Sequence, residues 1–107
     1  MTETALVVVS GTTPLLPIFA YPDQIDQIRR TECCVYTNTL NQDLIFELSK
    51  VHAIIALNGG RLAHLAIVCR ERGIPVISGV MLPPGASQAQ FYPNEIRLMK
   101  PSHLKLS

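Results

Sequence analysis

A glycine pair followed closely by a histidine is the group in this sequence best suited to chemistry. Gly59 and Gly60 begin the stretch "GGRLAHLAIVCRERGIPVISG", and His64 comes four residues after the second glycine. Because glycine has no Cβ, such a turn lets the backbone approach a ligand and direct several N–H groups at one phosphate. A neutral imidazole beside it is a competent nucleophile for a phosphoryl group and can hold it as a phosphoramidate. We therefore expect His64 to be catalytic and the two glycines to bind phosphate.

The residues after the turn predict a helix over 62–72. Gly73 suits a left-handed helix cap, and Pro75 prevents the helix from continuing. On a helical wheel, His64 lies opposite an apolar arc that must face the core. That arc consists of Leu62, Leu65, Ala66 and Cys69. His64 is therefore expected at the exposed side of the first helical turn, where unpaired N–H groups and the helix dipole favour an anion.

Four further side chains are candidates for the same site. Arg61 follows the glycine pair and is expected to bind phosphate, with a solvated helix-end charge as the alternative. Arg70 is a secondary candidate with the same alternative. Thr37 and Thr39, at the end of a predicted strand and in the loop after it, are secondary candidates because they can line the same end of the sheet as the glycine turn.

The elements around this group predict an α/β fold with a mixed sheet. Strand 52–57, the glycine turn, helix 62–72 and strand 75–80 form a βαβ unit, whose two strands should lie parallel with a right-handed crossover. Segment 11–23 has three prolines and no periodicity, so it is expected to be a loop or an edge segment. The other expected elements are a buried strand at 5–9, a helix at 24–30, a strand at 33–38, a helix at 42–50 capped by Asn41 with Leu44, Ile45 and Leu48 at core spacing, and strands at 89–92 and 95–99.

The composition limits the class of protein. The 107 residues are 48% hydrophobic with a net charge of +1, which fits one compact domain over residues 1–107 and predicts no binding to nucleic acid or to membranes. No apolar run approaches the ~18 residues of a membrane span, and the start "MTETALVVVSGTT" has an acidic residue where a secretory signal would be basic. A cytoplasmic location is expected.

The cysteines do not predict a metal site or a disulfide. Cys33, Cys34 and Cys69 are odd in number and have no CxxC spacing. Cys33 and Cys34 are adjacent in a predicted strand and should face opposite ways. We expect buried free thiols. The spacing of the cysteines and the histidines resembles no metal site, so no metal ligands are predicted.

Residues 59–79 resemble the signature of the swivelling phosphohistidine domain of the PEP-utilising enzymes. This family includes pyruvate phosphate dikinase, PEP synthase, enzyme I of the sugar phosphotransferase system and the rifampin phosphotransferases. Its signature runs from a glycine pair through the histidine to an Ala-Ile-Val-Ala-Arg-Glu segment, Gly-Ile-Pro and an apolar strand ending in glycine. The positions in register are Gly59, Gly60, His64, Ala66, Ile67, Val68, Arg70, Glu71, Gly73, Ile74, Pro75 and Gly79. The match is specific over about 20 residues and extends weakly over roughly the whole chain.

The resemblance implies a swivelling β/β/α domain and a phosphoryl carrier. In the family, the histidine moves between an ATP-grasp domain and a domain where PEP or an acceptor reacts. This chain has no GxxxxGK[ST] loop and is too short for a barrel. The resemblance therefore implies one component of a split phosphotransferase system, with an ATP-grasp or PEP-binding partner protein, or both. Mg and ATP or PEP are expected on the partner chains and no cofactor on this one; the sequence leaves a homo-oligomer open.

Two departures from the family pattern leave a second function open. Ala63 stands before the histidine, where the family usually has Ser, Thr or Cys. The family's glycine-rich entry segment is replaced by an apolar one, whose residues 14–21 belong either to the core or to a partner surface. The alternative to a carrier is a degenerate domain kept as a non-catalytic binding or regulatory subunit.

Overall fold

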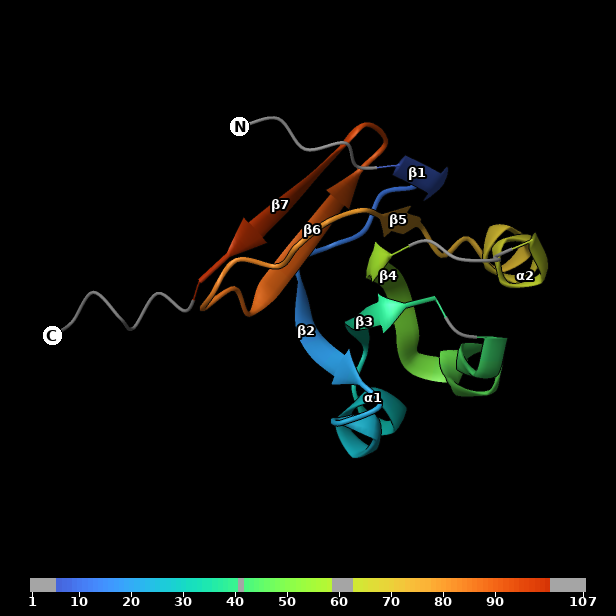
Figure 1. Cartoon of the computed structure of the whole chain (residues 1–107), viewed down its shortest axis with the longest axis horizontal. Helices are drawn as coiled ribbons and strands as arrows, with labels where there is room; N and C mark the ends of the chain where they lie inside the picture. The colour runs from blue at the N-terminus through green and yellow to red at the C-terminus, as the bar shows by residue number, and fades with distance from the viewer. Residues whose placement is uncertain (1–5, 41, 59–62, 101–107) are drawn as a thin grey trace, which may run out of the picture.

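The computed structural model of the chain describes residues 6–40, 42–58 and 63–100, and these form a sheet with helices packed on one side (Figure 1). The helices are α1 (Ile25–Arg30), the 3₁₀ helix η1 (Gln42–Lys50) and α2 (Ala63–Arg72). The strands are β1 (Leu6–Val9), β2 (Leu16–Tyr21), β3 (Cys33–Thr39), β4 (Val51–Asn58), β5 (Val76–Ser78), β6 (Gln88–Tyr92) and β7 (Glu95–Met99).

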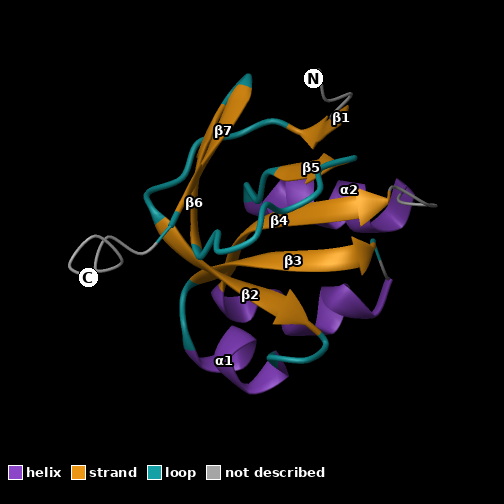
Figure 2. Cartoon of the chain, turned by 60° about the vertical axis from the view of Figure 1, so that its left-hand side comes forward, coloured by secondary structure: helices purple, strands orange, loops and turns teal. Residues whose placement is uncertain are grey.

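The sheet is mixed, as predicted. Its order is β1-β5-β4-β3-β2-β6-β7 over the described residues. The central strands β2 to β5 are parallel to one another, whereas β1 pairs antiparallel with β5, β6 pairs antiparallel with β2, and β6 and β7 form an antiparallel hairpin. Figure 2 shows this hairpin running across the direction of the central strands. Strands β4 and β5 are parallel neighbours joined through α2, which confirms the predicted βαβ pairing.

Two hydrophobic clusters lie on opposite faces of the central sheet. The cluster on the helix side includes Cys33, Ile54 and Leu65, and the cluster on the hairpin side includes Cys34 and Phe91. Both faces are buried, which explains the apolar run of residues 53–57 in β4. Cys33 and Cys34 are buried free thiols that join different clusters, as the alternation of strand side chains predicts.

The expectation that segment 11–23 is a loop or an edge is correct for residues 11–15 but wrong for Leu16–Tyr21, because β2 lies inside the sheet between β3 and β6. Leu16 and Pro17 pair with β6, and pairing with β3 begins only at Ile18. The N–H of Ile18 donates to the carbonyl of Ser87 on the β6 side, so the nitrogen of Pro17 faces β3 just before that ladder begins. Proline is tolerated here because its missing N–H costs no ladder hydrogen bond.

Two other segments differ in detail from the sequence prediction. Strand 5–9 was expected to be buried, but Leu6 and Val7 are 62% and 45% exposed because β1 is an outer strand. The predicted helix at 42–50 is a 3₁₀ helix with a non-helical backbone at Glu47. Its Leu44 and Leu48 are buried and Ile45 is partly buried, as their spacing predicts, while the expected cap Asn41 lies outside the described residues.

Candidate functional site

His64 is exposed in the first turn of α2. On the opposite side of this helix, Leu65 and Cys69 are 3% and 0% exposed and pack into the helix-side cluster. Glu71 is exposed with His64 and Ala66 is partly buried, so the predicted division into a core face and a solvent face is confirmed for the described residues; Leu62, the other residue of the predicted core arc, lies outside them. The core residues fix the helix against the sheet and leave the imidazole open to solvent.

The far end of α2 is held by its glycine cap. Gly73 has a φ of 72°, a left-handed conformation that favours glycine. The Ile74 N–H donates to the carbonyl of Cys69 at 2.8 Å, and the Gly73 N–H donates to the carbonyl of Arg70 at 3.3 Å. These two bonds form a Schellman motif, which satisfies the last carbonyls and turns the chain toward β5. The predicted cap is confirmed.

The carboxyl end of β4 is the part of the sheet nearest in sequence to His64, and the carboxyl end of β3 lies beside it. Thr39 at the end of β3 pairs with Asn58 at the end of β4, and the next described residue after Asn58 is Ala63. Thr39 is exposed there. Thr37 is buried, and its hydroxyl donates to the Thr39 carbonyl at 2.9 Å. Of the two threonines, only Thr39 therefore presents its side chain to solvent at this end.

The other predicted phosphate ligands are separated from His64 or lie outside the described residues. Gly59, Gly60 and Arg61 belong to residues that the structure does not describe, so their role stays a prediction. Arg70 is exposed on α2, but six residues after His64 place it about 9 Å along the helix axis and on a different side. The helix itself therefore does not bring Arg70 to the imidazole.

The thiols are not suited to nucleophilic chemistry at neutral pH. Burial raises the pKa of Cys33 and of Cys69 to about 11 and raises the pKa of Cys34 well above its usual range. Each of these side chains is 0% exposed. A protonated, enclosed thiol is a poor nucleophile and a poor metal ligand, so His64 is the more suitable nucleophile on α2.

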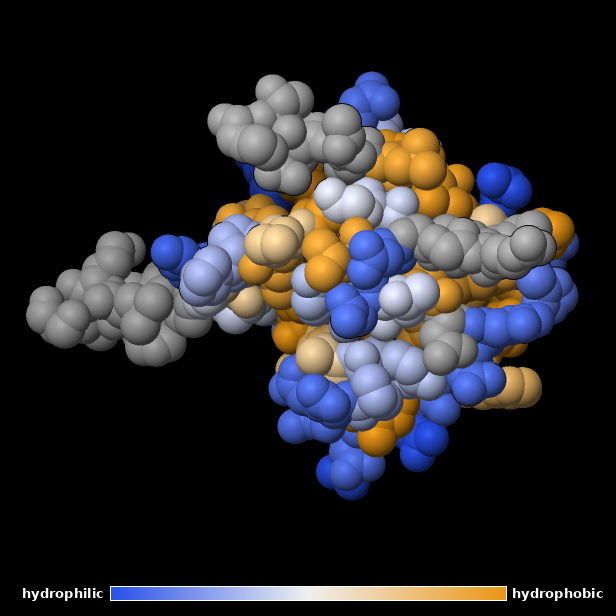
Figure 3. Space-filling view, in the orientation of Figure 1, coloured by the Kyte–Doolittle hydropathy of each residue, from blue (hydrophilic) through white to orange (hydrophobic). Residues whose placement is uncertain are grey.

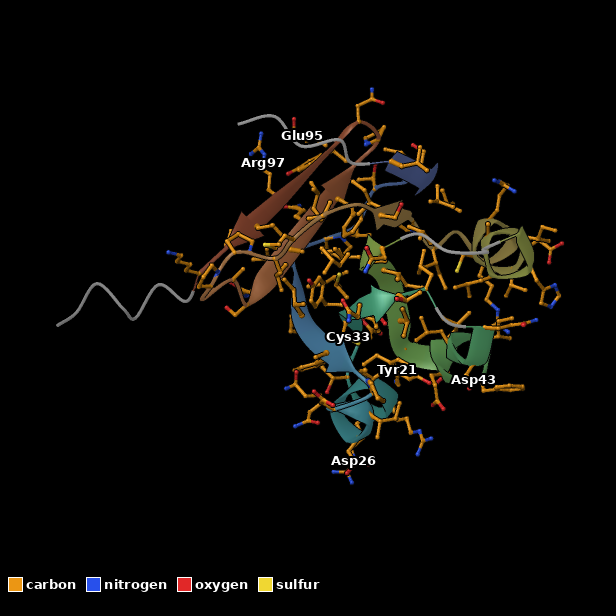
Figure 4. The ribbon with its side chains drawn as sticks, viewed as in Figure 1. Tyr21, Asp26, Cys33, Asp43, Glu95 and Arg97 are labelled. Atoms are coloured by element: carbon orange, nitrogen blue, oxygen red, sulfur yellow. The ribbon has the colours of Figure 1, made fainter. Side chains whose placement is uncertain are left out.

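A polar cluster that the sequence did not indicate lies at the end of β2. Burial first, and then the carboxylates of Asp43 and Glu47, raise the pKa of Tyr21. Glu47 is also bound by Arg29, whose Nε and Nη2 donate to its two carboxylate oxygens at 2.8 and 3.0 Å. Figure 4 shows Tyr21 and Asp43 on neighbouring elements. No local pattern could reveal this cluster, because its members come from β2, α1 and η1.

A hollow of about 360 Å³ lies at the opposite end of α2 from His64. It is lined by side chains that include His52 and Arg72. His52 is exposed, and its Nε2 atom lies 3.7 Å from Oε1 of Glu32. This hollow contributes nothing to a site at the first turn of α2.

Residues 6–40, 42–58 and 63–100 contain no group of three or more His, Cys, Asp or Glu side chains placed to hold a metal ion. No helix among them is long and apolar enough to cross a lipid bilayer.

Part of this chain is similar in sequence to known proteins. The family model for the mobile domain of PEP-utilising enzymes matches residues 30–84, just over half of the chain. A probable phosphoenolpyruvate synthase of Pyrococcus horikoshii is 41% identical over 56 residues, and the phosphoenolpyruvate synthase of Pyrococcus furiosus is 39% identical over 56 residues. Each match covers 52% of this chain but only 7% of the relative. The matched region is thus a small part of each relative's length.

Proposed function

The chain belongs to the family of PEP-utilising enzyme mobile domains, and from this premise we propose that it is a phosphohistidine carrier in a PEP- or ATP-dependent phosphotransferase system. His64 accepts a phosphoryl group from one partner protein and passes it to another. Those partners are an ATP-grasp protein, a PEP-binding protein or both, and they hold Mg and the ATP or PEP.

The exposure of His64 is the observation that carries this proposal. A carrier must present its nucleophile to active sites on other proteins, and His64 lies on the solvent side of a helix whose other side is buried. The first turn of a helix in general offers backbone N–H groups without helical partners and the positive end of the helix dipole. Both features favour a phosphoryl group on the imidazole.

The transfer itself needs little from this chain beyond position. The lone pair of the unprotonated imidazole nitrogen attacks phosphorus, the N–P bond forms, and the P–O bond to the donor breaks with its electrons on the donor oxygen. The proton on the other ring nitrogen can then leave to solvent. Phosphoryl transfer has a loose transition state, so positioning and charge stabilisation dominate its catalysis. Thr39 and the predicted ligands Gly59, Gly60 and Arg61 would supply hydrogen bonds or charge on this side of the reaction.

Ala63 favours a second candidate function. The family usually has a hydroxyl or thiol at this position, and its loss is what a degenerate binding or regulatory subunit would show. A hydrogen bond to a charged group is worth about 1.5–3 kcal/mol, which corresponds to roughly 10- to 150-fold in rate. This loss slows a carrier without forbidding its reaction.

Phosphorylation of His64 tests the proposal. With a donor protein and ATP or PEP, we expect an acid-labile, base-stable phosphate on His64 that is absent from His64→Ala and is retained or formed faster in Ala63→Ser. Phosphoramidate, a small-molecule donor, should also modify His64 without any partner protein. His52→Ala is the matched control, because His52 is another exposed histidine and its loss should leave the label unchanged.

Mass spectrometry under mildly alkaline conditions locates the phosphate. A chain that stays unmodified with a donor protein of demonstrated activity, together with a His64→Ala variant that keeps the cellular activity, would exclude the carrier. The binding or regulatory subunit would then be the better description.

A further inference from the structure

The hollow at the far end of α2 lies where three elements meet. Residues near the end of η1, at the start of β4 and in the turn after α2 line it, and its volume is about 360 Å³. Hollows that hold small molecules have volumes from about 300 Å³ upward. Three of the lining residues, Leu48, Val51 and Ile74, are buried and expose almost no surface. A ligand in the hollow would therefore contact mainly its polar lining.

The exposed side chains of this lining supply hydrogen-bond donors from all three elements. They are Ser49 on η1, His52 on β4 and Arg72 at the end of α2. Both ionisable residues among the described lining residues are basic, and none of those residues is acidic. Within residues 6–40, 42–58 and 63–100, Arg72 forms no ion pair with an acidic side chain. The lining therefore favours an anionic ligand.

The outer surface of the two helices is polar as well. Figure 3 shows mostly hydrophilic side chains over the visible part of α2 and η1. An apolar ligand would find little complementary surface on these helices, whereas a charged one would keep its solvation on the open side of the hollow.

We propose that this hollow binds the phosphate group of a small metabolite. The guanidinium of Arg72 donates from its planar fork to two phosphate oxygens. The Ser49 hydroxyl and one ring N–H of His52 donate to the other oxygens. A carboxylate has only two oxygens, which Arg72 alone would satisfy, so donors from three elements match a phosphate group better.

This site is separate from the phosphoryl group proposed on His64. Arg72 follows His64 by eight residues, which places the two about 12 Å apart along the axis of α2. Binding in the hollow therefore does not depend on phosphotransfer by His64, and the two sites can be tested independently.

Two features keep the affinity modest. Oε1 of Glu32 lies 3.7 Å from Nε2 of His52, and its negative charge repels an anion. The last turn of a helix also carries partial negative charge. The carbonyls of Cys69 and Arg70 already accept the N–H groups of Ile74 and Gly73, which reduces this effect at the end of α2. We expect dissociation constants of about 1–10 mM for inorganic phosphate.

Amide chemical shifts of the whole chain during a titration with inorganic phosphate test the proposal. We expect saturable changes at Ser49, His52, Arg72 and Gly73. Chloride at the same ionic strength should cause none, and acetate should bind at least about tenfold more weakly because it accepts fewer hydrogen bonds. Changes near His64 would report a different site and are fitted separately.

Two arginine variants identify the site. Arg72→Gln should weaken phosphate binding at these amides by about 10- to 150-fold, because it removes a charged donor. Arg70→Gln is the matched control, since Arg70 is also exposed on α2, carries the same charge and is not among the described residues that line the hollow. Phosphate should bind this control as it binds the wild type.

Three results would overturn the proposal. They are no saturable change at the four amides, an equal loss of binding in Arg72→Gln and Arg70→Gln, and acetate binding as tight as phosphate binding. Circular dichroism checks that each variant folds. Ser49→Ala keeps the test valid if Arg72→Gln unfolds, because Ser49 is small and exposed, and its loss should also weaken phosphate binding.

Discussion

Replacing Gly73 should destabilise the protein through backbone strain alone. An added Cβ at this position meets no atom within 4 Å, so crowding contributes nothing, but the φ of 72° lies in the left-handed region. That conformation costs an L-residue about 1–2 kcal/mol, and the lower entropy of the unfolded alanine chain returns about 0.4–1 kcal/mol. Gly73→Ala should therefore lower the free energy of unfolding by about 1 kcal/mol, which is roughly 4–8 °C in melting temperature.

Urea unfolding at neutral pH measures this change. Gly73→Asn should cost less than Gly73→Ala, because asparagine tolerates the left-handed region, and Gly73→Val should cost more, because a β-branched side chain tolerates it least. Glu71→Ala, at an exposed helical position close by, is the control and should change stability by less than about 0.5 kcal/mol. Wild-type stability in Gly73→Ala, or equal costs for Asn, Ala and Val, would refute the assignment of strain to this φ.

Three other perturbations should also change stability. Because burial raises the pKa values of Cys33 and Cys69 to about 11, the folded state keeps protons that the unfolded state loses above about pH 9. The free energy of unfolding should therefore fall between pH 9 and 11, by at most about 3 kcal/mol per thiol, and urea unfolding across this range should show a smaller fall in Cys69→Ala. Ile54→Ala empties a fully buried position in the helix-side cluster and should cost about 2–5 kcal/mol in the same assay, so a loss under 1 kcal/mol would contradict the packing. Arg29 lowers the pKa of Glu47, so their pair stabilises the fold above the ordinary glutamate pKa, and this stabilisation is lost as the pH falls through the lowered pKa. In Glu47→Gln, the free energy of unfolding should therefore fall less steeply as the pH is lowered, and an unchanged fall would argue against the pair.

The βαβ unit was predictable because its signals are local. Leu65 and Cys69 of helix α2 are buried at helical spacing, and the helix ends at Arg72, before Gly73 and Pro75, so the sequence near it indicates both its type and its end. Strand β2 was not predictable in the same way. Its prolines argue against a strand, and its place inside the sheet depends on pairing with β3 and with β6, which lies about 70 residues later in the chain.

The features of the candidate site were likewise predictable only where their signals are local in the sequence. The exposure of His64 follows from the helical wheel, since the apolar arc of α2 leaves only one side for solvent. The hydrogen bond from the Thr37 hydroxyl to the Thr39 carbonyl could not be read from the sequence, because Thr37 and Thr39 are the same residue type in the same strand. The environment of Tyr21 likewise depends on residues from three elements that meet only in the folded chain.

The pairing of β1 with β5 has a consequence for folding during synthesis. β1 is the first of the described strands to leave the ribosome, but its partner β5 begins only at Val76. The strands β2, β3 and β4, which pair with near neighbours in sequence, are complete before that residue is made. At typical translation rates of about 5–20 residues per second, β1 therefore stays without its partner for several seconds. During that interval both sides of an uncharged, β-branched segment are open, so nascent chains on neighbouring ribosomes should be most prone to cross-pairing through this strand.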